Sequence, residues 1–244
     1  MSPDDHLLTA AQRDSLEGTI FARHRLEEQY ENLDQQHQAA SLGMWVFLAT
    51  EVMFFGTLFL SVAVYRYLYP LPFEKASSRL NWMIGGTNTL VLLLSSLTIV
   101  LAVHFARLAQ RKRIVLFLGL TALLGVCFLG FKALEYYLDY RENLIPGWRF
   151  DASEWVSRDR LRPDQVPQVK LFLFLYWVMT GFHALHVTIG ICAVLVILAL
   201  AHSGRFSATY YAPVDVTALY WHFVDIVWIF LLPTLYLLGT HHVG

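Results

Sequence analysis

Five long apolar stretches constrain this chain more than any other feature of its sequence. At about 1.5 Å per helical residue, each of them exceeds the roughly 30 Å thickness of a bilayer's hydrocarbon core. Hydrophobic residues make up 56% of the chain and charged residues only 15%, whereas about a quarter of the residues of soluble domains are charged. The sequence therefore predicts an all-α integral membrane bundle of five transmembrane helices, over Leu42–Tyr67, Trp82–Ala106, Ile114–Leu138, Leu171–Ala201 and Val216–Leu238.

The remaining segments are polar. Residues 1–41 carry eight acidic and three basic side chains, and apolar residues at helical spacing predict an amphipathic helix over about Ser15–Gln38. We therefore divide the chain into a polar acidic N-terminal tail, 1–41, and a five-helix transmembrane domain, 42–244. The Pro70-Leu-Pro72 segment is expected to end the first transmembrane helix in a turn. A long polar loop is expected over residues 139–169.

The orientation is predicted from the connector between the second and third helices. Four basic residues lie within Arg107–Arg113, and short loops rich in Lys and Arg stay in the cytoplasm. Two crossings separate this connector from the N-terminus, so the N-terminus is predicted to be cytoplasmic too. The loop after the third helix also holds arginines, but its acidic residues partly offset them.

Glu51 lies midway along the first apolar stretch. On membrane-insertion scales, placing an acidic residue at that depth costs roughly 2.5–3.5 kcal/mol of free energy. The Glu51 carboxyl is therefore expected to face protein, water or a lipid head group. One interpretation is a proton relay or polar anchor. The other is a neutral carboxylic acid that donates one structural hydrogen bond. Intramembrane ionisable groups favour the functional interpretation.

Other polar residues recur inside the last two apolar stretches. His183 and His186 are three residues apart, so we expect them to share a helix face near Gly190. His222 and Asp225 have the same spacing in the last helix, and Trp228 lies three residues further on.

The second and third apolar stretches also hold polar side chains. Asn88, Ser95 and Ser96 predict a hydrogen-bonding stripe between helices. Lys132 and Glu135 are expected either to reach the membrane surface or to pair.

The histidines allow three interpretations: haem or metal ligation, a proton or ion path, and simple structural or lipid contacts. Bis-histidine haem needs facing ligands, which His183 or His186 could supply with His222. Cys127 and Cys192 stand alone in apolar runs, which argues against a disulfide framework or a cysteine-rich metal cluster. The net charge of −1, without a basic stripe, argues against nucleic-acid binding.

Taken together, these stretches resemble subunit III of haem–copper terminal oxidases, in the cytochrome c oxidase branch. The similarity covers nearly everything after residue 41, and the motifs of the last two helices are specific in combination. The Glu51 motif favours cytochrome c oxidases over quinol oxidases, which commonly lack that acid. The matching segments are Leu42-Gly-Met-Trp, Glu51-Val-Met-Phe-Phe, Asn88-Thr-Leu, Ser95-Ser96, Gly181-Phe-His183-Ala-Leu-His186-Val and Tyr220-Trp-His-Phe-Val-Asp225-Ile-Val-Trp228.

The resemblance implies a subunit without a catalytic residue, within an oxidoreductase that reduces oxygen to water and pumps protons. Such a subunit packs mainly against subunit I, beside subunit II and other respiratory-chain subunits. It binds phospholipid and supports proton uptake, and haem and copper are held by its partners. In this family Glu51 corresponds to the buried carboxyl. Lipid or subunit contacts are expected at His183, His186, His222, Asp225 and Trp228, and polar contacts between helices at Asn88, Ser95, Ser96 and Glu135.

The chain departs from the family pattern in three ways. It lacks the two leading helices of the seven-helix form, which some bacterial oxidases carry on subunit I. Lys132 stands where many members have Gln, and Leu60 replaces a common Trp. The implied location is the bacterial plasma (inner) membrane. The alternatives are a subunit-III-like protein of a nitric oxide reductase system and a b-haem electron-transfer protein.

Overall fold

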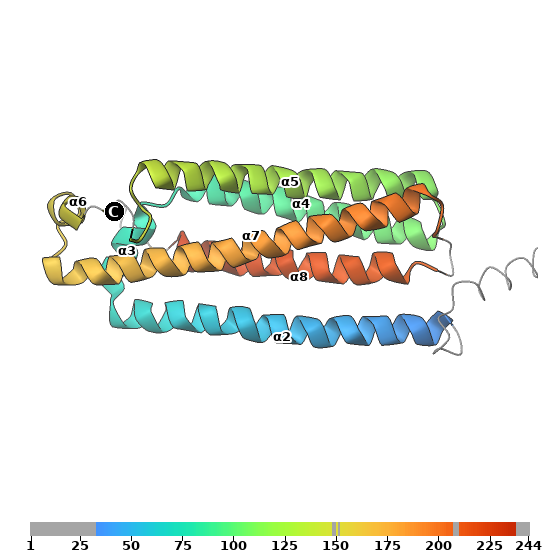
Figure 1. Cartoon of the computed structure of the whole chain (residues 1–244), viewed down its shortest axis with the longest axis horizontal. Coiled ribbons are helices and arrows are strands. Elements are labelled where there is room, and N and C mark those ends of the chain that lie inside the picture. Colours follow the sequence, from blue (N-terminus) through green and yellow to red (C-terminus); the bar gives the residue numbers. More distant parts are fainter. Residues whose placement is uncertain (1–32, 148–149, 151, 207–209, 238–244) are drawn as a thin grey trace, which may run out of the picture.

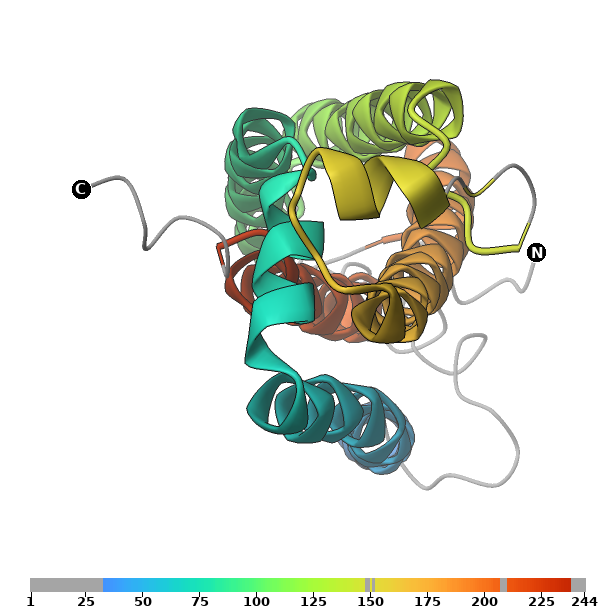
Figure 2. The same cartoon turned by 90° about the vertical axis from the view of Figure 1, so that its left-hand side faces the viewer.

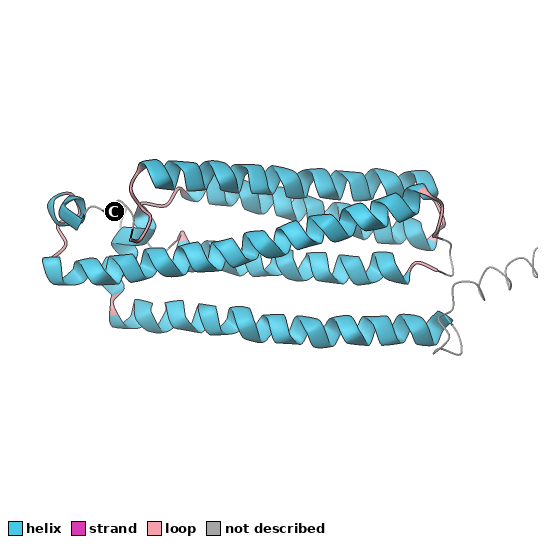
Figure 3. Ribbon diagram, viewed as in Figure 1, coloured by secondary structure: helices cyan, strands magenta, loops and turns pink. Residues whose placement is uncertain are grey.

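The structure, a computed structural model, describes residues 33–147, 150, 152–206 and 210–237. Every regular element in these residues is a helix (Figures 1 and 3). The elements are α2 (Leu33–Leu68), α3 (Pro70–Ser78), α4 (Trp82–Arg107), α5 (Arg111–Arg141), α6 (Ala152–Ser157), the 3₁₀ helix η2 (Pro163–Gln165), α7 (Val166–His202) and α8 (Ala212–Leu235).

The predicted five-helix membrane bundle is confirmed. Five helices, α2, α4, α5, α7 and α8, are long and apolar enough to cross a membrane. Four of them form a ring in which α4 contacts α5, α5 contacts α7, α7 contacts α8, and α8 contacts α4. Helix α2 lies outside this ring, against α8 and α7 (Figure 2).

Helix α2 uses one narrow stripe to contact the ring. Leu48, Phe55 and Val62 are buried and are seven residues apart. Seven residues make about two helical turns, so these side chains lie above one another on one face. Most other apolar residues of α2 are exposed, and they are available to lipid or to another chain.

The first helix differs from its prediction at both ends. It begins at Leu33, not Leu42, and its 36 residues extend about 54 Å, well beyond the hydrocarbon thickness. Part of the predicted amphipathic helix therefore continues directly into the membrane helix, and residues 15–32 lie outside the described part. The helix ends at Leu68, and Pro70 then begins α3, because proline is well suited to the first turn of a helix.

The long loop predicted over 139–169 is shorter than expected. Helix α5 continues to Arg141 and α7 begins at Val166. Between them, α6 crosses the end of the ring together with α3 (Figure 2). We call this the α6 end of the bundle. The opposite end, where Arg107–Arg113 joins α4 to α5, is called the connector end.

Arg79 joins the two short helices at the α6 end. Its guanidinium donates to Glu154 at 2.8 Å and to Asp159, and it lies 4.5 Å over the ring of Trp155. The hydrogen bond from Arg79 holds the pKa of Glu154 below its ordinary value. These contacts fix the extramembrane segment between α5 and α7.

Trp221 of α8 contacts the other three helices of the ring. Its indole N–H donates to the Ser95 hydroxyl on α4 at 3.0 Å. Its ring lies against the backbone at Gly125 on α5 and Gly190 on α7, where a Cβ would come within 2.7 and 3.1 Å of it. The close backbone approach expected at Gly190 is therefore present, and the indole of Trp221 fills it.

Candidate functional site: a buried carboxyl–imidazole pair between α2 and α7

Glu51 and His186 meet between α2 and α7. The Glu51 Oε2 and His186 Nε2 atoms are 3.0 Å apart, and both side chains are largely buried. This contact joins the helix outside the ring to the ring itself. The polar residue in the middle of the first apolar stretch therefore faces protein, as one of the sequence expectations required.

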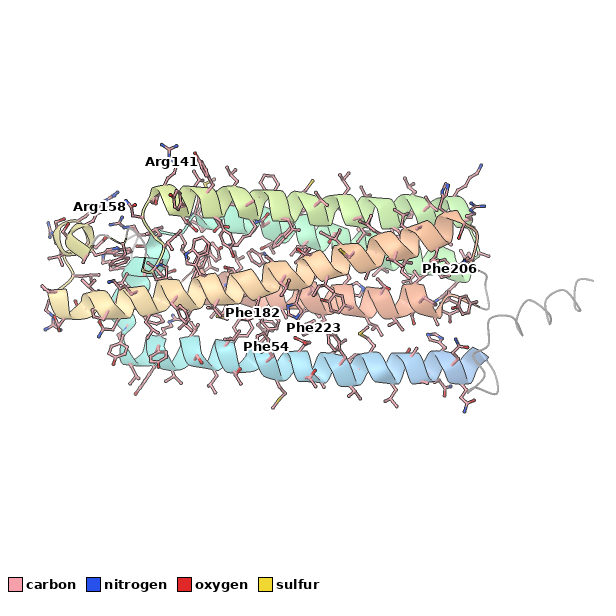
Figure 4. All side chains as sticks on the ribbon, in the orientation of Figure 1. Phe54, Arg141, Arg158, Phe182, Phe206 and Phe223 are labelled. Atoms are coloured by element: carbon pink, nitrogen blue, oxygen red, sulfur yellow. The ribbon has the colours of Figure 1, made fainter. Side chains whose placement is uncertain are left out.

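A group of aromatic rings lies beside this pair. Phe55 lies 5.2 Å from the His186 ring, and Phe54 packs edge-on against Phe182. Phe223 of α8 completes the group at 6.2 Å from Phe55. The labelled Phe54, Phe182 and Phe223 gather where α2 faces α7 and α8 (Figure 4). Apolar surroundings of this kind strengthen the interaction between the two polar groups.

The hydrogen bonds of His186 determine which protons the pair can hold. The His186 Nδ1 atom lies 2.8 Å from the Phe182 carbonyl oxygen. A carbonyl only accepts, so Nδ1 carries a hydrogen. Nε2 then either accepts from a protonated Glu51 or, as part of an imidazolium, donates to a Glu51 carboxylate. In either case one proton lies between the two side chains.

His183 has a different environment from His186, although the sequence placed them on one face. Its side chain is 1% exposed and lies between Phe128 and Trp228, at 5.6 and 5.1 Å between ring centroids. Neither ring nitrogen has a hydrogen-bond partner in the described part of the chain. Three residues correspond to about 300° around a helix, which is enough here to turn His183 toward α5 and α8 while His186 faces α2.

Three of the residues at which lipid or subunit contact is expected lie inside the bundle. His183, Asp225 and Trp228 are 1%, 4% and 0% exposed, so the bundle's own side chains cover them. Trp228 donates its indole N–H to Thr89 on α4 at 3.0 Å. The sequence spacing identified one face of the last helix but not that this face points into the ring. His186 and His222 remain partly accessible.

His222 and Asp225 are brought together through Ser96. The His222 Nδ1 and Ser96 Oγ atoms are 2.7 Å apart, and the Ser96 hydroxyl also faces the Asp225 carboxyl. One Asp225 oxygen has no partner among the described residues. His222 also lines a groove of ≈ 330 Å³ that reaches Arg107 and Asp215 at the connector end.

The predicted polar stripe on α4 is only partly formed. Ser95 and Ser96 contact Trp221 and His222 of α8. Asn88 is buried, but its amide has no hydrogen-bond partner in the described residues, which differs from the expectation. The stripe was inferred from residue type alone, and residue type does not show whether a partner lies opposite.

Lys132 and Glu135 pair in the ring, near the α6 end. Their charged atoms are 3.0 Å apart and both residues are 1% exposed. Tyr176, Tyr236 and Asp139 share this network, and none of these three was singled out for it from the sequence. The signal was present, because Lys132, Glu135 and Asp139 recur at spacings of three and four residues, which defines one helix face.

His183, His186 and His222 are each engaged within the bundle. Both ring nitrogens of His186 are hydrogen-bonded within the chain, His222 is bonded to Ser96, and His183 is enclosed by two aromatic rings. A bis-histidine haem needs two facing, free nitrogens with space for the macrocycle between them. Within the described residues no group of three or more His, Cys, Asp or Glu could hold a metal ion.

Comparison with known proteins identifies the family. The family profile described as cytochrome c oxidase subunit III matches residues 170–240, which include the His183, His186, His222 and Asp225 positions. The cytochrome c oxidase subunit 3 of Synechocystis sp. is 30% identical over 197 residues, covering 80% of this chain and 74% of the relative. This chain belongs to the subunit III family of haem–copper oxidases.

Further relatives have a different description. The probable quinol oxidase subunit 3 of Staphylococcus saprophyticus is 28% identical, over 81% of this chain and 88% of the relative. The corresponding protein of Staphylococcus haemolyticus is 27% identical, over 85% and 92%. The chain is thus a multi-pass membrane subunit of a multi-subunit respiratory oxidase, and membership of the family leaves the electron donor open.

Proposed function

We propose that this chain is the non-redox subunit III of an aerobic cytochrome c oxidase, where it stabilises subunit I, binds phospholipid and supports proton uptake. The observation that carries the proposal is the Glu51–His186 pair at 3.0 Å. It combines the acid that favours the cytochrome c branch with an imidazole able to exchange its proton. Subunit I is the main partner in this proposal, with subunit II and other respiratory subunits beside it.

The proton role follows from the two states of the pair. A neutral acid beside a neutral imidazole and a carboxylate beside an imidazolium differ by the movement of one proton over one hydrogen bond. Neither state leaves a net charge in the apolar surroundings, which would be costly. The pair can therefore take up or release a proton only when a neighbouring group compensates for the change in net charge. This behaviour is expected of a proton relay, and not of a carboxyl group exposed at the surface.

An apolar groove supports the lipid role. It has a volume of ≈ 840 Å³ and lies between α2 and α8, with Phe59, Val62 and Phe230 along its sides and Arg66 near one end. An acyl chain suits such an apolar lining. The Arg66 guanidinium would face the lipid phosphate, because cationic residues at helix ends reach the head-group region.

The cofactors and the location are part of the same proposal. In this proposal the haem and copper of the complex reside in the partner subunits, because His183, His186 and His222 are engaged in other contacts. The chain lies in the bacterial plasma membrane with its N-terminus in the cytoplasm. Its connector end, with four basic residues in Arg107–Arg113, then faces the cytoplasm.

A quinol oxidase is the second candidate, because the Staphylococcus relatives are described as quinol oxidase subunits. Oxygen uptake by the purified complex distinguishes the two. With cytochrome c as donor, we expect rapid uptake that persists when quinol is absent. Oxygen uptake that occurs with quinol but not with cytochrome c would reject the cytochrome c assignment. Reduction of nitric oxide without oxygen reduction would favour the nitric oxide reductase alternative.

Substitutions at Glu51 test the proton role. Glu51→Gln keeps the size and one hydrogen bond but removes the acidic proton, and Glu51→Ala removes the bridge between α2 and α7. We expect the Gln variant to assemble normally yet turn over more slowly or inactivate sooner, most clearly at high pH, where protons are scarce. Wild-type turnover and lifetime in the Gln variant would leave Glu51 a structural anchor only.

A further inference from the structure

The buried network near the α6 end contains more acid than base. Lys132, Glu135 and Asp139 come from α5, Tyr176 from α7, and Tyr236 follows α8. These side chains are at most 6% exposed. Fully ionised, the network would hold one positive and two negative charges. A net charge in such surroundings is strongly unfavourable.

Six hydrogen-bonding contacts connect the five groups. The Lys132 Nζ atom lies 3.0 Å from Glu135, 3.3 Å from the Tyr176 hydroxyl and 2.7 Å from the Tyr236 hydroxyl. The Glu135 Oε1 atom lies 2.7 Å from the Tyr236 hydroxyl and 3.2 Å from that of Tyr176. The Tyr176 hydroxyl also lies 2.8 Å from Asp139 Oδ2.

The hydrogens of the ionised network are too few for these contacts. An ammonium group provides three donors and each tyrosine provides one, while carboxylates only accept. Five hydrogens therefore serve six contacts, and the single Tyr176 hydrogen would have to serve both Glu135 and Asp139. One additional proton, carried by a carboxyl group, completes the set and also brings the net charge to zero.

Asp139 is the better position for this proton. Glu135 contacts the Lys132 ammonium directly, which favours its ionised form, whereas Asp139 reaches Lys132 only through Tyr176. We propose that Asp139 is a proton-binding site: it holds one exchangeable proton and donates it to the Tyr176 hydroxyl oxygen. Tyr176 then donates to Glu135 and accepts from Lys132 and Asp139. All six contacts are satisfied.

The proton makes the packing at this end dependent on pH. The network joins α5, α7 and the segment after α8. At 6% exposure Asp139 retains a route to solvent. The folded network binds the proton, while an unfolded chain releases it at neutral pH, so the linked stability falls as pH rises. The titratable groups around Asp139 are Lys132, Glu135, Tyr136, Glu142, Tyr176 and Tyr236, with His183 close to Lys132.

Two matched substitutions test the assignment in the purified oxidase complex. Asp139→Asn replaces the protonated acid by a group of the same shape that still donates to Tyr176. We expect it to retain the subunit in the complex at the wild-type level. Glu135→Gln removes the counter-ion of Lys132, and we expect the subunit to be lost. Loss of the subunit in Asp139→Asn, or full retention in Glu135→Gln, would overturn the proposal.

The pH dependence and an infrared spectrum provide two further measurements. As pH rises, the temperature at which the subunit leaves the wild-type complex should fall more than in Asp139→Asn. At mildly acidic pH, where a free aspartate would already be ionised, the difference spectrum between wild type and Asp139→Asn should contain the C=O band of a protonated carboxylic acid. A carboxylate band instead, or equal pH dependence in both proteins, would refute the bound proton.

Discussion

Gly125→Ala is predicted to destabilise the bundle by overpacking it at Trp221. A Cβ at this position would lie 2.7 Å from the Trp221 Cη2 atom and 3.0 Å from Cγ1 of Ile191. The indole has little freedom to move away. Its N–H is bonded to Ser95 at 3.0 Å, and its other side lies against Gly190. Helix α5 would have to shift away from α7 and α8.

The expected magnitude is the cost of overpacking a tight core, about 1–3 kcal/mol. Alanine's higher helix propensity offsets up to about 1 kcal/mol of it in water. Gly119 and Gly130 provide matched controls on the same helix, because a Cβ at either position would meet nothing within 4 Å. Gly119→Ala and Gly130→Ala should therefore be neutral or slightly stabilising.

The assay is unfolding of the full-length chain in mixed micelles of mild detergent and dodecyl sulfate. The prediction is a lower free energy of unfolding for Gly125→Ala than for either control. Trp221→Phe should relieve part of the effect in the double variant, giving a coupling energy between neighbouring sites. Equal stability of Gly125→Ala and Gly119→Ala would refute the argument from close packing.

Three more predictions concern the two ends of the bundle. A cysteine introduced into Arg107–Arg113 should react with an impermeant reagent only from the cytoplasmic face, and labelling from outside would reverse the orientation. Arg66→Gln should reduce the amount of phospholipid that copurifies, measured by mass spectrometry, whereas substitution of the exposed Arg158 by Gln should not. Equal amounts of lipid in both variants would show that Arg66 does not contribute to lipid binding. Because Arg79 lowers the pKa of Glu154, their contact should stabilise α6 above the ordinary glutamate pKa and weaken as pH falls through the lowered value. Hydrogen exchange in α6 should show this acid dependence in wild type and lose it in Arg79→Gln.

The number and approximate span of the membrane helices could be predicted from the sequence, because hydrophobic length alone determines them. Their ends were less predictable. The stretch before Leu42 is polar and gave no membrane signal, yet it continues α2 outside the hydrocarbon region. Pro70 predicts the end of the first helix, but the same residue also suits the first turn of a new helix.

The site was predictable in its residues but not in its pairings. The depth of Glu51 required a partner, and helical periodicity placed His186 within reach of some neighbouring helix. Which helix it faces depends on the rotation of α7 in the ring, which a single sequence does not specify. For the same reason the sequence does not show that His183 faces the inside of the ring, or that Lys132 and Glu135 belong to a larger network.

The most direct test of the account is to isolate the complex through a tag on this chain, in a mild detergent, and to analyse it by native mass spectrometry with metal analysis of each separated subunit. We predict one haem–copper catalytic subunit per copy of this chain, with iron and copper confined to the partner subunits. A chain that purifies without an oxidase catalytic subunit, or that retains stoichiometric iron or copper once separated, would contradict the account.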